Sequence, residues 1–579
     1  MVVVGGCQRN RRAPPCPWGP GPSIPAGQKR WPCGAAGRED ARCPEPSEEG
    51  TAVDVDRPEV RTQAGVLRGG AGRAGTAVFR GIPFAEPPVG ALRFGAPRPA
   101  RGWDGVREAT AFGTPPPQSA VFGMDALAPP DVDDGDWLTL NVWTPDPAPG
   151  AGLPVMVWLF GGAYVIGMSG QPEYDGGRLA AEGVVLVTLN YRLGIEGFAH
   201  IEGAPANRGL LDQVAALAWV RDNIRAFGGD PDRVTVFGES AGAGSLAALL
   251  AMPRAAGLFR RAVTQSVPGP FLSAPLAADI AGEFAAELGL RPTAAELATV
   301  GPGLLPAAAD AVGARMEEYA HRWGVLAHTA IPLAPVVDGD VLPRAPWEAL
   351  AAGAARDVEL VAGHTRDEFR LFMALDGTLG EELTEDRVTA ALRTFSPGTG
   401  GTGGSGGLGG ADGSGGSRGE EAYRKAVPGL DAAGLYELVR SDWLFRMPSL
   451  HLAEAQIAGG GRAHVYELVW EAPGMGGLLG ACHGLDVPLV FGNLRGGLPA
   501  LLFGEAPPAE VEELSALFRA AWTGFAAGEG PGWPPYDVDR RPVRLFDTRP
   551  TVTAYPEEVS RELWREHVFG ALPLLGPGV

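Results

Sequence analysis

Lysine is almost absent from this chain. Only Lys29 and Lys425 occur among 579 residues, and arginine supplies nearly all of the positive charge. Acidic residues still outnumber basic ones, 68 against 48, which gives a formal net charge of −20 at pH 7. This balance argues against a nucleic-acid partner, because a phosphate backbone is bound by basic patches. Together with the excess of Ala, Gly and Pro, the shortage of lysine indicates codon bias in a high-GC bacterium.

Cysteine is also scarce, and it is unevenly placed. Four of the five cysteines fall in the first fifty residues, and the fifth, Cys482, stands alone in the body of the chain. The early spacing matches no C-x-x-C knuckle, so we expect neither a zinc module nor a disulfide module there. Because this segment is rich in Pro, Gly and Arg, we expect residues 1–55 to be a disordered tail or an over-extended start of translation.

Long hydrophobic runs are missing as well. The apolar stretch Val2–Val4 is too short for the core of a signal peptide, and no later stretch reaches 18 apolar residues. No Asn-x-Ser/Thr glycosylation sequon occurs. We therefore expect a cytoplasmic protein without a membrane span.

The most informative feature that is present is the pentapeptide Gly238-Glu239-Ser240-Ala241-Gly242, which follows the apolar run 234–237. The pattern predicts a strand, a sharp turn and a helix. Small neighbours let the backbone turn tightly enough to expose the hydroxyl of Ser240 as a nucleophile. The same turn aims the N–H of Ala241 at the oxygen of an attacked carbonyl. In a chain with 86 glycines the string alone is weak evidence, so its context decides.

The context contains the other parts of a serine hydrolase. A second apolar strand, 154–160, ends in a loop of small residues, Gly161-Gly162-Ala163, whose bare N–H groups can face a pocket. An acid and a histidine must then follow in the order Ser, Asp/Glu, His. Glu368 comes after the strand-like run 358–363, and His483 comes just before the apolar run 485–491.

Many further segments match one family in that family's own order. The chain resembles the type-B carboxylesterases, the cholinesterase-like branch of the α/β-hydrolases, and it looks most like bacterial members similar to para-nitrobenzyl esterases. The resemblance runs from about Val60 to about His567 and is carried by residues 79–85, 87–90, 140–143, 190–194, 207–213, 219–224 and 227–231.

The resemblance implies an α/β-hydrolase fold, with a central, mostly parallel sheet flanked by helices and with helical insertions between the acid and the histidine. It implies one domain over residues 56–570, followed by a C-terminal tail at 571–579. Residues 397–419 are nearly all Gly, Ser and Thr, and such a segment cannot bury enough surface to offset its ordering entropy. We expect it to be a flexible surface insertion.

The site residues carry over from the family one by one. Ser240 is expected to be the nucleophile, His483 the general base and Glu368 the acid that orients the imidazole. The oxyanion is expected to rest on the N–H groups of Gly162, Ala163 and Ala241.

Each role has a competitor in the chain. Ser266 lacks the flanking glycine pair and is expected to support the core. Asp367 adjoins Glu368, and spacing alone does not separate two adjacent acids. The later histidines, which we expect to be ordinary packed or surface residues, are His451, His464 and His567.

The implied function is a serine carboxylesterase that acts on small-molecule esters without a metal or an organic cofactor. The segment 115–136 lacks both the cysteine and the extra tryptophan that cholinesterases use, so cholinesterase activity is not expected. Two alternatives stay open, an amide- or carbamate-cleaving hydrolase on the same triad and a binding module that has lost catalysis. The sequence gives neither the physiological substrate nor the oligomeric state.

Overall fold

A computed structural model of the protein describes residues 57–119, 135–397 and 414–576. The chain divides into two compact units, Met1–Asp54 and Val55–Val579, and every described residue belongs to the second. The expected tail at residues 1–55 therefore lies outside the described residues.

One 11-stranded sheet dominates this unit, in the order β16-β15-β14-β13-β10-β9-β7-β8-β6-β4-β3. The pairs from β8 through β15 are parallel, whereas the pairs at the two edges are antiparallel. The strands are β3 (Gly70–Ala71), β4 (Ala77–Pro83), β6 (Thr139–Thr144), β7 (Leu153–Leu159), β8 (Val185–Leu189), β9 (Gly229–Glu239), β10 (Arg261–Gln265), β13 (Glu359–Thr365), β14 (Arg462–Leu468), β15 (Pro542–Phe546) and β16 (Thr551–Ala554).

Two small sheets accompany the large one. The first joins β1 (Glu59–Arg61), β2 (Val66–Arg68) and β5 (Val106–Glu108). The second joins β11 (Phe271–Ser273), β12 (Val336–Val337) and β17 (Ala571–Leu572). Because β17 pairs with β11, the expected C-terminal tail at 571–579 begins with an ordered strand, and its last residues, 577–579, lie outside the described part.

The central strands are apolar without interruption because both of their faces are covered. All five residues of β8 are buried, as are six of the seven residues in β7 and in β13. Strands buried on both faces read as continuous hydrophobic runs rather than as alternating patterns. For this reason the apolar runs in the sequence predict β7, β9 and β13 clearly.

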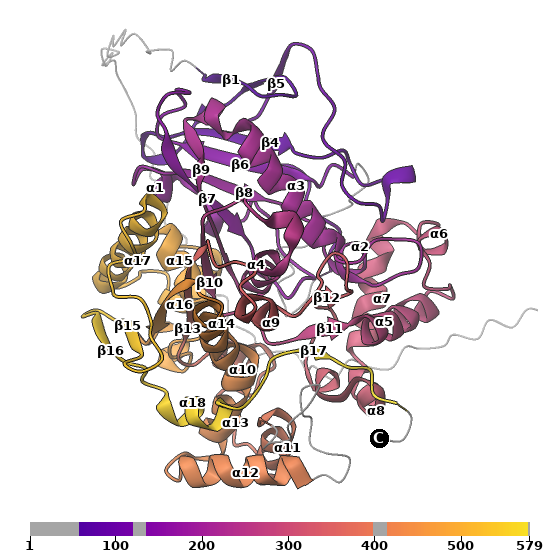
Figure 1. Ribbon diagram of the computed structural model, residues 1–579, viewed down its shortest axis with the longest axis vertical. Coiled ribbons are helices and arrows are strands. Elements are labelled where there is room, and N and C mark those ends of the chain that lie inside the picture. Colours follow the sequence, from indigo (N-terminus) through magenta and orange to yellow (C-terminus); the bar gives the residue numbers. More distant parts are fainter. Residues whose placement is uncertain (1–56, 120–134, 398–413, 577–579) are drawn as a thin grey trace, which may run out of the picture. The chain divides into compact units, whose positions relative to one another are not determined.

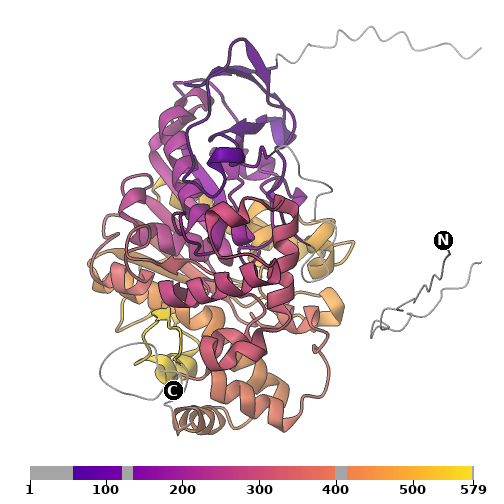
Figure 2. The same ribbon diagram turned by 90° about the vertical axis from the view of Figure 1, so that its right-hand side faces the viewer.

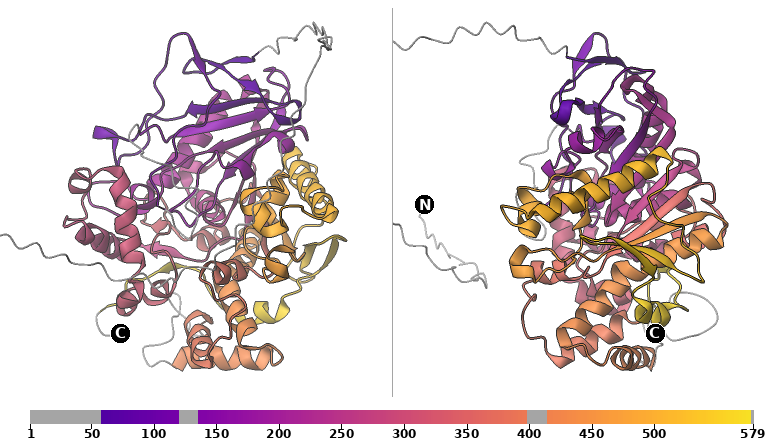
Figure 3. Two further views of the ribbon diagram at one scale, coloured as in Figure 1. Left: turned by 180° about the vertical axis from the view of Figure 1, so that it is seen from behind. Right: turned by 90° about the vertical axis from the view of Figure 1, so that its left-hand side faces the viewer.

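Helices cover both faces of the sheet. In Figure 1, α3, α4, α9 and α14 lie in front of the strands, and the last three contact one another in turn. On the opposite face α17 packs with α15, which also contacts α1, and Figure 3 shows this long C-terminal helix crossing the strands. A further group, α5 to α8, stands beside the sheet, and α5 and α7 face the viewer in Figure 2.

The α-helices have the following bounds: α1 Gly177–Ala180, α2 Gly194–Phe198, α3 Arg208–Asn223, α4 Ala241–Ala251, α5 Ala274–Glu287, α6 Ala294–Leu297, α7 Leu305–Gly313, α8 Ala320–Trp323, α9 Pro346–Ala351, α10 Arg370–Leu375, α11 Glu385–Phe395, α12 Ser414–Ala426, α13 Ala432–Ser441, α14 Met447–Ala458, α15 Asp486–Phe491, α16 Gly497–Phe503, α17 Ala509–Ala527 and α18 Glu558–Trp564.

The expected fold class is confirmed. The sheet is mostly parallel and flanked by helices, and α10 to α14 lie in the chain between Glu368 and His483, ahead of strand β14. The expected flexible insertion extends too far, because α12 begins at Ser414 and makes residues 414–419 helical. The side chain of Tyr423 on this helix is fully buried, and its packing stabilises a helix that continues back into the glycine-rich sequence. Residues 398–413 lie outside the described part.

None of the helices within the described ranges is long and apolar enough to cross a bilayer.

Candidate active site

Ser240 occupies a strained turn between a strand and a helix. Strand β9 ends at Glu239, helix α4 begins at Ala241, and Ser240 between them has φ 55° and ψ −124°. Residues other than glycine rarely adopt a positive φ, and such strain clusters at functional sites. The N–H of Ser240 donates to the carbonyl of Gln265 at 2.9 Å, which fixes the turn against β10.

The two glycines of the pentapeptide allow this turn to exist. A Cβ on Gly242 would lie 2.0 Å from the carbonyl oxygen of Leu159, and one on Gly238 would lie 2.7 Å from the carbonyl carbon of Gly242. Both distances are shorter than real Cβ contacts. The glycines are therefore required by close packing of the turn on β7.

The small-residue loop after β7 lies directly against the serine. A Cβ on Gly161 would approach the Cβ of Ser240 to 3.1 Å, while Gly162 and Ala163 have φ values of 107° and 53°. Within the described ranges, the N–H groups of Gly162, Ala163 and Ala241 donate to no protein acceptor. Unpaired N–H groups beside a serine hydroxyl can receive the negative oxygen of a tetrahedral intermediate.

Glu368 and His483 meet although 115 positions separate them. Oε2 of Glu368 lies 2.6 Å from Nδ1 of His483, and both side chains are buried. Oε1 accepts two further hydrogen bonds, at 2.6 Å from the hydroxyl of Ser266 and at 2.9 Å from the N–H of Thr365. Burial alone would raise the pKa of Glu368, but the attraction of His483 and these hydrogen bonds outweigh it and lower the pKa.

The other imidazole nitrogen faces a second carboxyl group. Nε2 of His483 lies 3.0 Å from Oε1 of Glu239, the residue that precedes the serine. Among the described residues no hydrogen bond joins the hydroxyl of Ser240 to His483. Hydrogen bonds of catalytic groups are often loose in the absence of substrate and tighten when it binds.

Burial and charge set the protonation of this pair. Burial of the imidazole would lower the pKa of His483, but Glu239, Glu368 and Asp486 together raise it to about 9. Burial raises the pKa of Glu239 to about 8, against the attraction of His483. The two groups are linked, because each charge favours the charged form of the other across the 3.0 Å contact.

Aromatic rings enclose the histidine. Phe445 stacks on its imidazole with ring centroids 4.1 Å apart and an interplanar angle of 23°, and Phe372 lies at 5.3 Å. Phe445 belongs to a π-helix, Asp442–Arg446, an irregular turn that is often found at functional sites. The rings keep water from the imidazole on one side and limit its rotation.

The structure separates the competing residues. The carboxylate of Asp367 accepts the N–H of Ala481 and pairs with Arg370, so Glu368 is the acid that faces the imidazole. The other histidines have different partners: His364 contacts Thr365 O and Tyr555, His464 contacts Trp533 O and Glu359, and His451 and His567 both pack on Phe569.

Cys482 adjoins the histidine in sequence without sharing its chemistry. Its side chain is fully buried, and burial raises the pKa of the thiol far above its usual range. A buried thiol of high pKa is a poor nucleophile.

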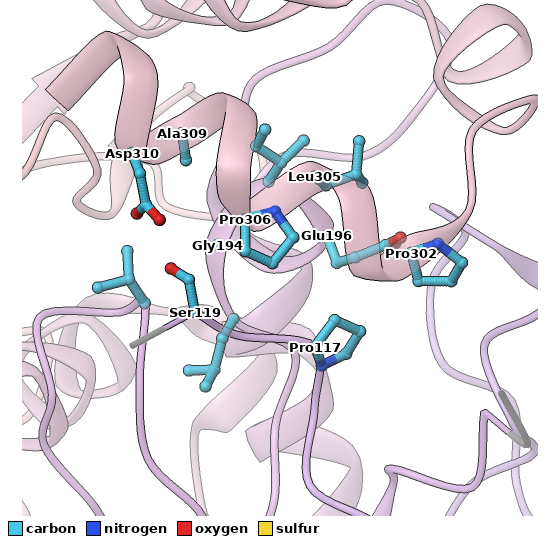
Figure 4. Close-up of a pocket in the computed structure, with 12 residues that line it drawn as sticks. Pro117, Ser119, Gly194, Glu196, Pro302, Leu305, Pro306, Ala309 and Asp310 are labelled. Atoms are coloured by element: carbon cyan, nitrogen blue, oxygen red, sulfur yellow. The ribbon is translucent and has the colours of Figure 1, made fainter. Parts of the chain in front are cut away.

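A separate cleft lies between residues 117–119, α2 and α7 (Figure 4). Neither Ser240 nor His483 lines it. Its buried carboxyl group, Glu196, is neutralised by Arg93, whose Nη2 lies 2.6 Å from Oε1. Within the described residues, no cluster of three or more His, Cys, Asp or Glu side chains is arranged to hold a metal ion.

Sequence reasoning missed two residues of this site. Ser266 was assigned to the core, yet its hydroxyl binds Glu368, and Glu239 was treated only as the variable position of the pentapeptide. Both stand at or just beyond the carboxyl end of a buried strand, β10 for Ser266 and β9 for Glu239. That position was the available signal, because ligands of open α/β sheets bind at the carboxyl ends of the strands.

A serine on a strand-to-helix turn, beside unpaired N–H groups and a Glu–His pair, is the arrangement of a serine hydrolase of the α/β-hydrolase fold. The chain belongs to the carboxylesterase family, whose profile, described as "Carboxylesterase family", matches residues 56–564. It is accordingly a serine carboxylesterase, an enzyme that hydrolyses carboxylic esters.

Individual relatives agree with this assignment. The chain is 38% identical over 517 residues to the para-nitrobenzyl esterase of Bacillus subtilis strain 168, an alignment that covers 87% of this chain and 97% of the relative. It is 33% identical over 540 residues to the phenmedipham hydrolase of Pseudarthrobacter oxydans, covering 89% and 99% of the two chains. The solved carboxylesterase EST55 of Geobacillus stearothermophilus superposes with a TM-score of 0.74 at 34% identity. The superposition covers 88% of this chain and 100% of the EST55 chain.

Proposed function

We propose that Ser240 is the nucleophile of this carboxylesterase, His483 its general base and Glu368 the acid that orients the imidazole. The contact of 2.6 Å between Glu368 Oε2 and His483 Nδ1 carries the proposal. It fixes the tautomer in which Nδ1 holds a proton and leaves Nε2 as the base.

In the first half of the reaction, His483 Nε2 takes the proton of the Ser240 hydroxyl while the serine oxygen attacks the ester carbonyl. The developing oxyanion rests on the N–H groups of Gly162, Ala163 and Ala241. These donors are held by the turn after β7 and by the start of α4, so they need no reorganisation as charge develops. The imidazolium is stabilised by the carboxylate of Glu368.

In the second half, the imidazolium of His483 gives its proton to the leaving alcohol, and an acyl-enzyme remains on Ser240. Water then enters, His483 removes its proton, and attack on the acyl carbonyl forms a second oxyanion on the same donors. Collapse of this intermediate breaks the bond to the Ser240 oxygen, which takes the proton back from the imidazolium of His483, and releases the carboxylic acid. Each step uses only side chains and N–H groups of this chain together with water.

Hydrolysis of p-nitrophenyl acetate, butyrate and octanoate by the wild type and by Ser240→Ala tests these roles. We expect the wild type to turn over several chain lengths and the variant to lose all but a residual rate, because the oxyanion donors alone give only a small part of catalysis. Ser273→Ala, which removes the hydroxyl that caps α5, is the matched control and should keep wild-type kcat. A Ser240→Ala enzyme with wild-type kcat would contradict the proposal.

We further propose that residues 56–570 form a single hydrolase domain in a bacterial, cytoplasmic protein. The continuous sheet, which takes strands from β3 to β16, supports one domain. The buried free thiol of Cys482 fits a reducing compartment. Fractionation of the source cell with an antibody to the folded protein tests the location.

A further inference from the structure

The two loops that bring Glu368 and His483 together are joined by a third residue, Asp367. Its N–H donates to the carbonyl of Ala481 at 2.9 Å, and its carboxylate Oδ2 accepts the N–H of Ala481 at 2.9 Å. Both backbone polar groups of Ala481 are therefore satisfied by one residue. The N–H of His483 also points to the carbonyl of Glu368, at 3.4 Å.

The remaining carboxylate oxygen of Asp367 is held from the other side. Oδ1 pairs with Nη2 of Arg370 at 3.0 Å, and the carboxylate is mostly buried, with its side chain 12% exposed. Gly480 passes close to this group with φ 58°, and a Cβ there would lie 2.4 Å from Oδ2 of Asp367. The loop that carries the histidine is thus shaped around the carboxylate.

The acid loop and the histidine loop are far apart in sequence. Helices α10 to α14 and strand β14 separate the two in sequence, so no short stretch of chain ties them together. A bidentate contact from Asp367 fixes both the position and the direction of the segment that leads into His483. The imidazole of His483 is then already placed beside the carboxylate of Glu368.

We propose that Asp367 is a positioning residue, which sets the contact between Glu368 and His483 by clamping Ala481. The inference rests on the proposed roles of Glu368 and His483 and adds the residue that aligns them. Asp367 touches neither Ser240 nor the reacting atoms, and it acts through the histidine loop. Its carboxylate is needed as an acceptor at a fixed place, and its charge pairs with Arg370.

Loss of the clamp should slow the chemical steps and spare binding. In Asp367→Ala we expect kcat to fall by about 10²-fold, the usual effect of a misplacement of about 1 Å, with KM nearly unchanged. Because the imidazole loses part of its contact with Glu368, the pKa of His483 should fall and the acidic limb of the kcat profile should move to lower pH. Asp367→Asn keeps an oxygen that can accept the Ala481 N–H, so it should retain most of kcat.

The experiment measures kcat, KM and the pH profile with p-nitrophenyl butyrate for the wild type, Asp367→Ala and Asp367→Asn. Proton NMR of the same enzymes follows the low-field signal of the short Nδ1–H···Oε2 hydrogen bond, which should shift only in Asp367→Ala. Asp537→Ala is the matched control, because Asp537 also pairs with an arginine three positions later, Arg540, at 3.0 Å, but at the exposed surface. A purely structural role for Asp367 would lower thermal stability without moving the NMR signal or the pH profile.

The proposal is overturned if folded Asp367→Ala keeps wild-type kcat and an unshifted NMR signal. It is also overturned if kcat falls as far in Asp367→Asn as in Asp367→Ala. If Asp367→Ala does not fold, Gly480→Ala replaces it, because its Cβ would displace the same carboxylate, and wild-type kcat there overturns the proposal equally. Ser240→Ala in the same assay distinguishes the proposed role of Ser240 from the proposed role of Asp367. An active Ser240→Ala enzyme would remove the proposed nucleophile, whereas an inactive one beside a fully active Asp367→Ala enzyme would remove only the clamp.

Discussion

The hydroxyl of Ser266 lies 2.6 Å from Oε1 of Glu368 and donates to it inside the core. Ser266→Ala removes this donor and leaves the oxygen with the N–H of Thr365 alone. A hydrogen bond to a charged group contributes about 1.5–3 kcal/mol, so we expect a loss of stability in that range together with a lower kcat. Urea unfolding and p-nitrophenyl ester kinetics at pH 7 measure both quantities.

The pH dependence of that loss has a definite sign. The pKa of Glu368 is lowered in the folded state, so the stabilisation is complete above the unfolded pKa of about 4.3 and disappears as pH falls through the folded value. The stability difference between the wild type and Ser266→Ala should therefore narrow on acidification. A difference that stays constant down to the acid transition would show that the hydroxyl does not act through the charge of Glu368.

Glu239→Gln should change the pH profile through the histidine. Glu239 is the strongest of the groups that raise the pKa of His483, and glutamine keeps its shape without its charge. The pKa of His483 should fall, so the acidic limb of kcat/KM should move to lower pH because the imidazole becomes a free base earlier. Glu59→Gln, at a half-exposed carboxylate paired with Arg68, is the control and should leave the limb in place. An unmoved limb in Glu239→Gln would mean that Glu239 is already neutral across the working range.

Gly242→Ala should destabilise the turn that presents Ser240. The added Cβ would lie 2.0 Å from the carbonyl oxygen of Leu159, so β7 and β9 must separate or the turn must open. Overpacking in a core costs about 1–3 kcal/mol, and activity should be lost along with it. Gly282→Ala makes the opposite change, since nothing lies within 4 Å of its Cβ and it is inside α5, where alanine gains about 0.5–1 kcal/mol over glycine. Thermal unfolding of the two variants should therefore shift in opposite directions.

Asp212→Ala should be among the most destabilising substitutions away from the site. Arg192 and Asp212 are both fully buried and form a two-pronged pair at 2.7 and 2.8 Å. Removing one partner of a buried pair leaves an uncompensated charge and costs about 3–5 kcal/mol. The exposed pair of Arg254 and Asp340, at 3.0 Å, gives the comparison, and Asp340→Ala should cost about 1 kcal/mol or less. Similar unfolding midpoints for the two variants would contradict this ranking.

The parts of the fold that the sequence predicts are those in which local and global signals agree. Strand β7 reads as an apolar run, ends in small residues, and is buried along nearly its whole length. By contrast, the helix that starts at Ser414 was predicted as a loop, because glycine and serine disfavour helices on their own. The buried ring of Tyr423, which follows on the same helix, supplies a tertiary contact that no local rule contains. Strand β17 is similar, since a pair of residues becomes a strand only through β11.

At the site, the order of Ser240, Glu368 and His483 along the chain predicted their roles, because each residue stands next to a recognisable strand or motif. Spacing alone did not separate Glu368 from the adjacent Asp367, and the choice of Glu368 came from register with the family. Ser266 was missed because its role depends on the distance between two strands, β10 and β13, that are neighbours only in the folded sheet. Contacts of this kind are decided by pairing register rather than by residue type.

The hydrogen bonds between Asp367 and Ala481 also close a loop of chain. The chain leaves this point at Arg370 and returns to it at Gly480, after α10 to α14 and the sheet strand β14. The entropy of closing such a loop grows only with the logarithm of its length, by about 0.6 kcal/mol for each doubling. Residues can thus be inserted into or deleted from the connections between these helices at small thermodynamic cost, whereas β14 has to keep its register between β13 and β15. Those connections are a place where a catalytic scaffold can acquire new substrates without rebuilding its chemistry.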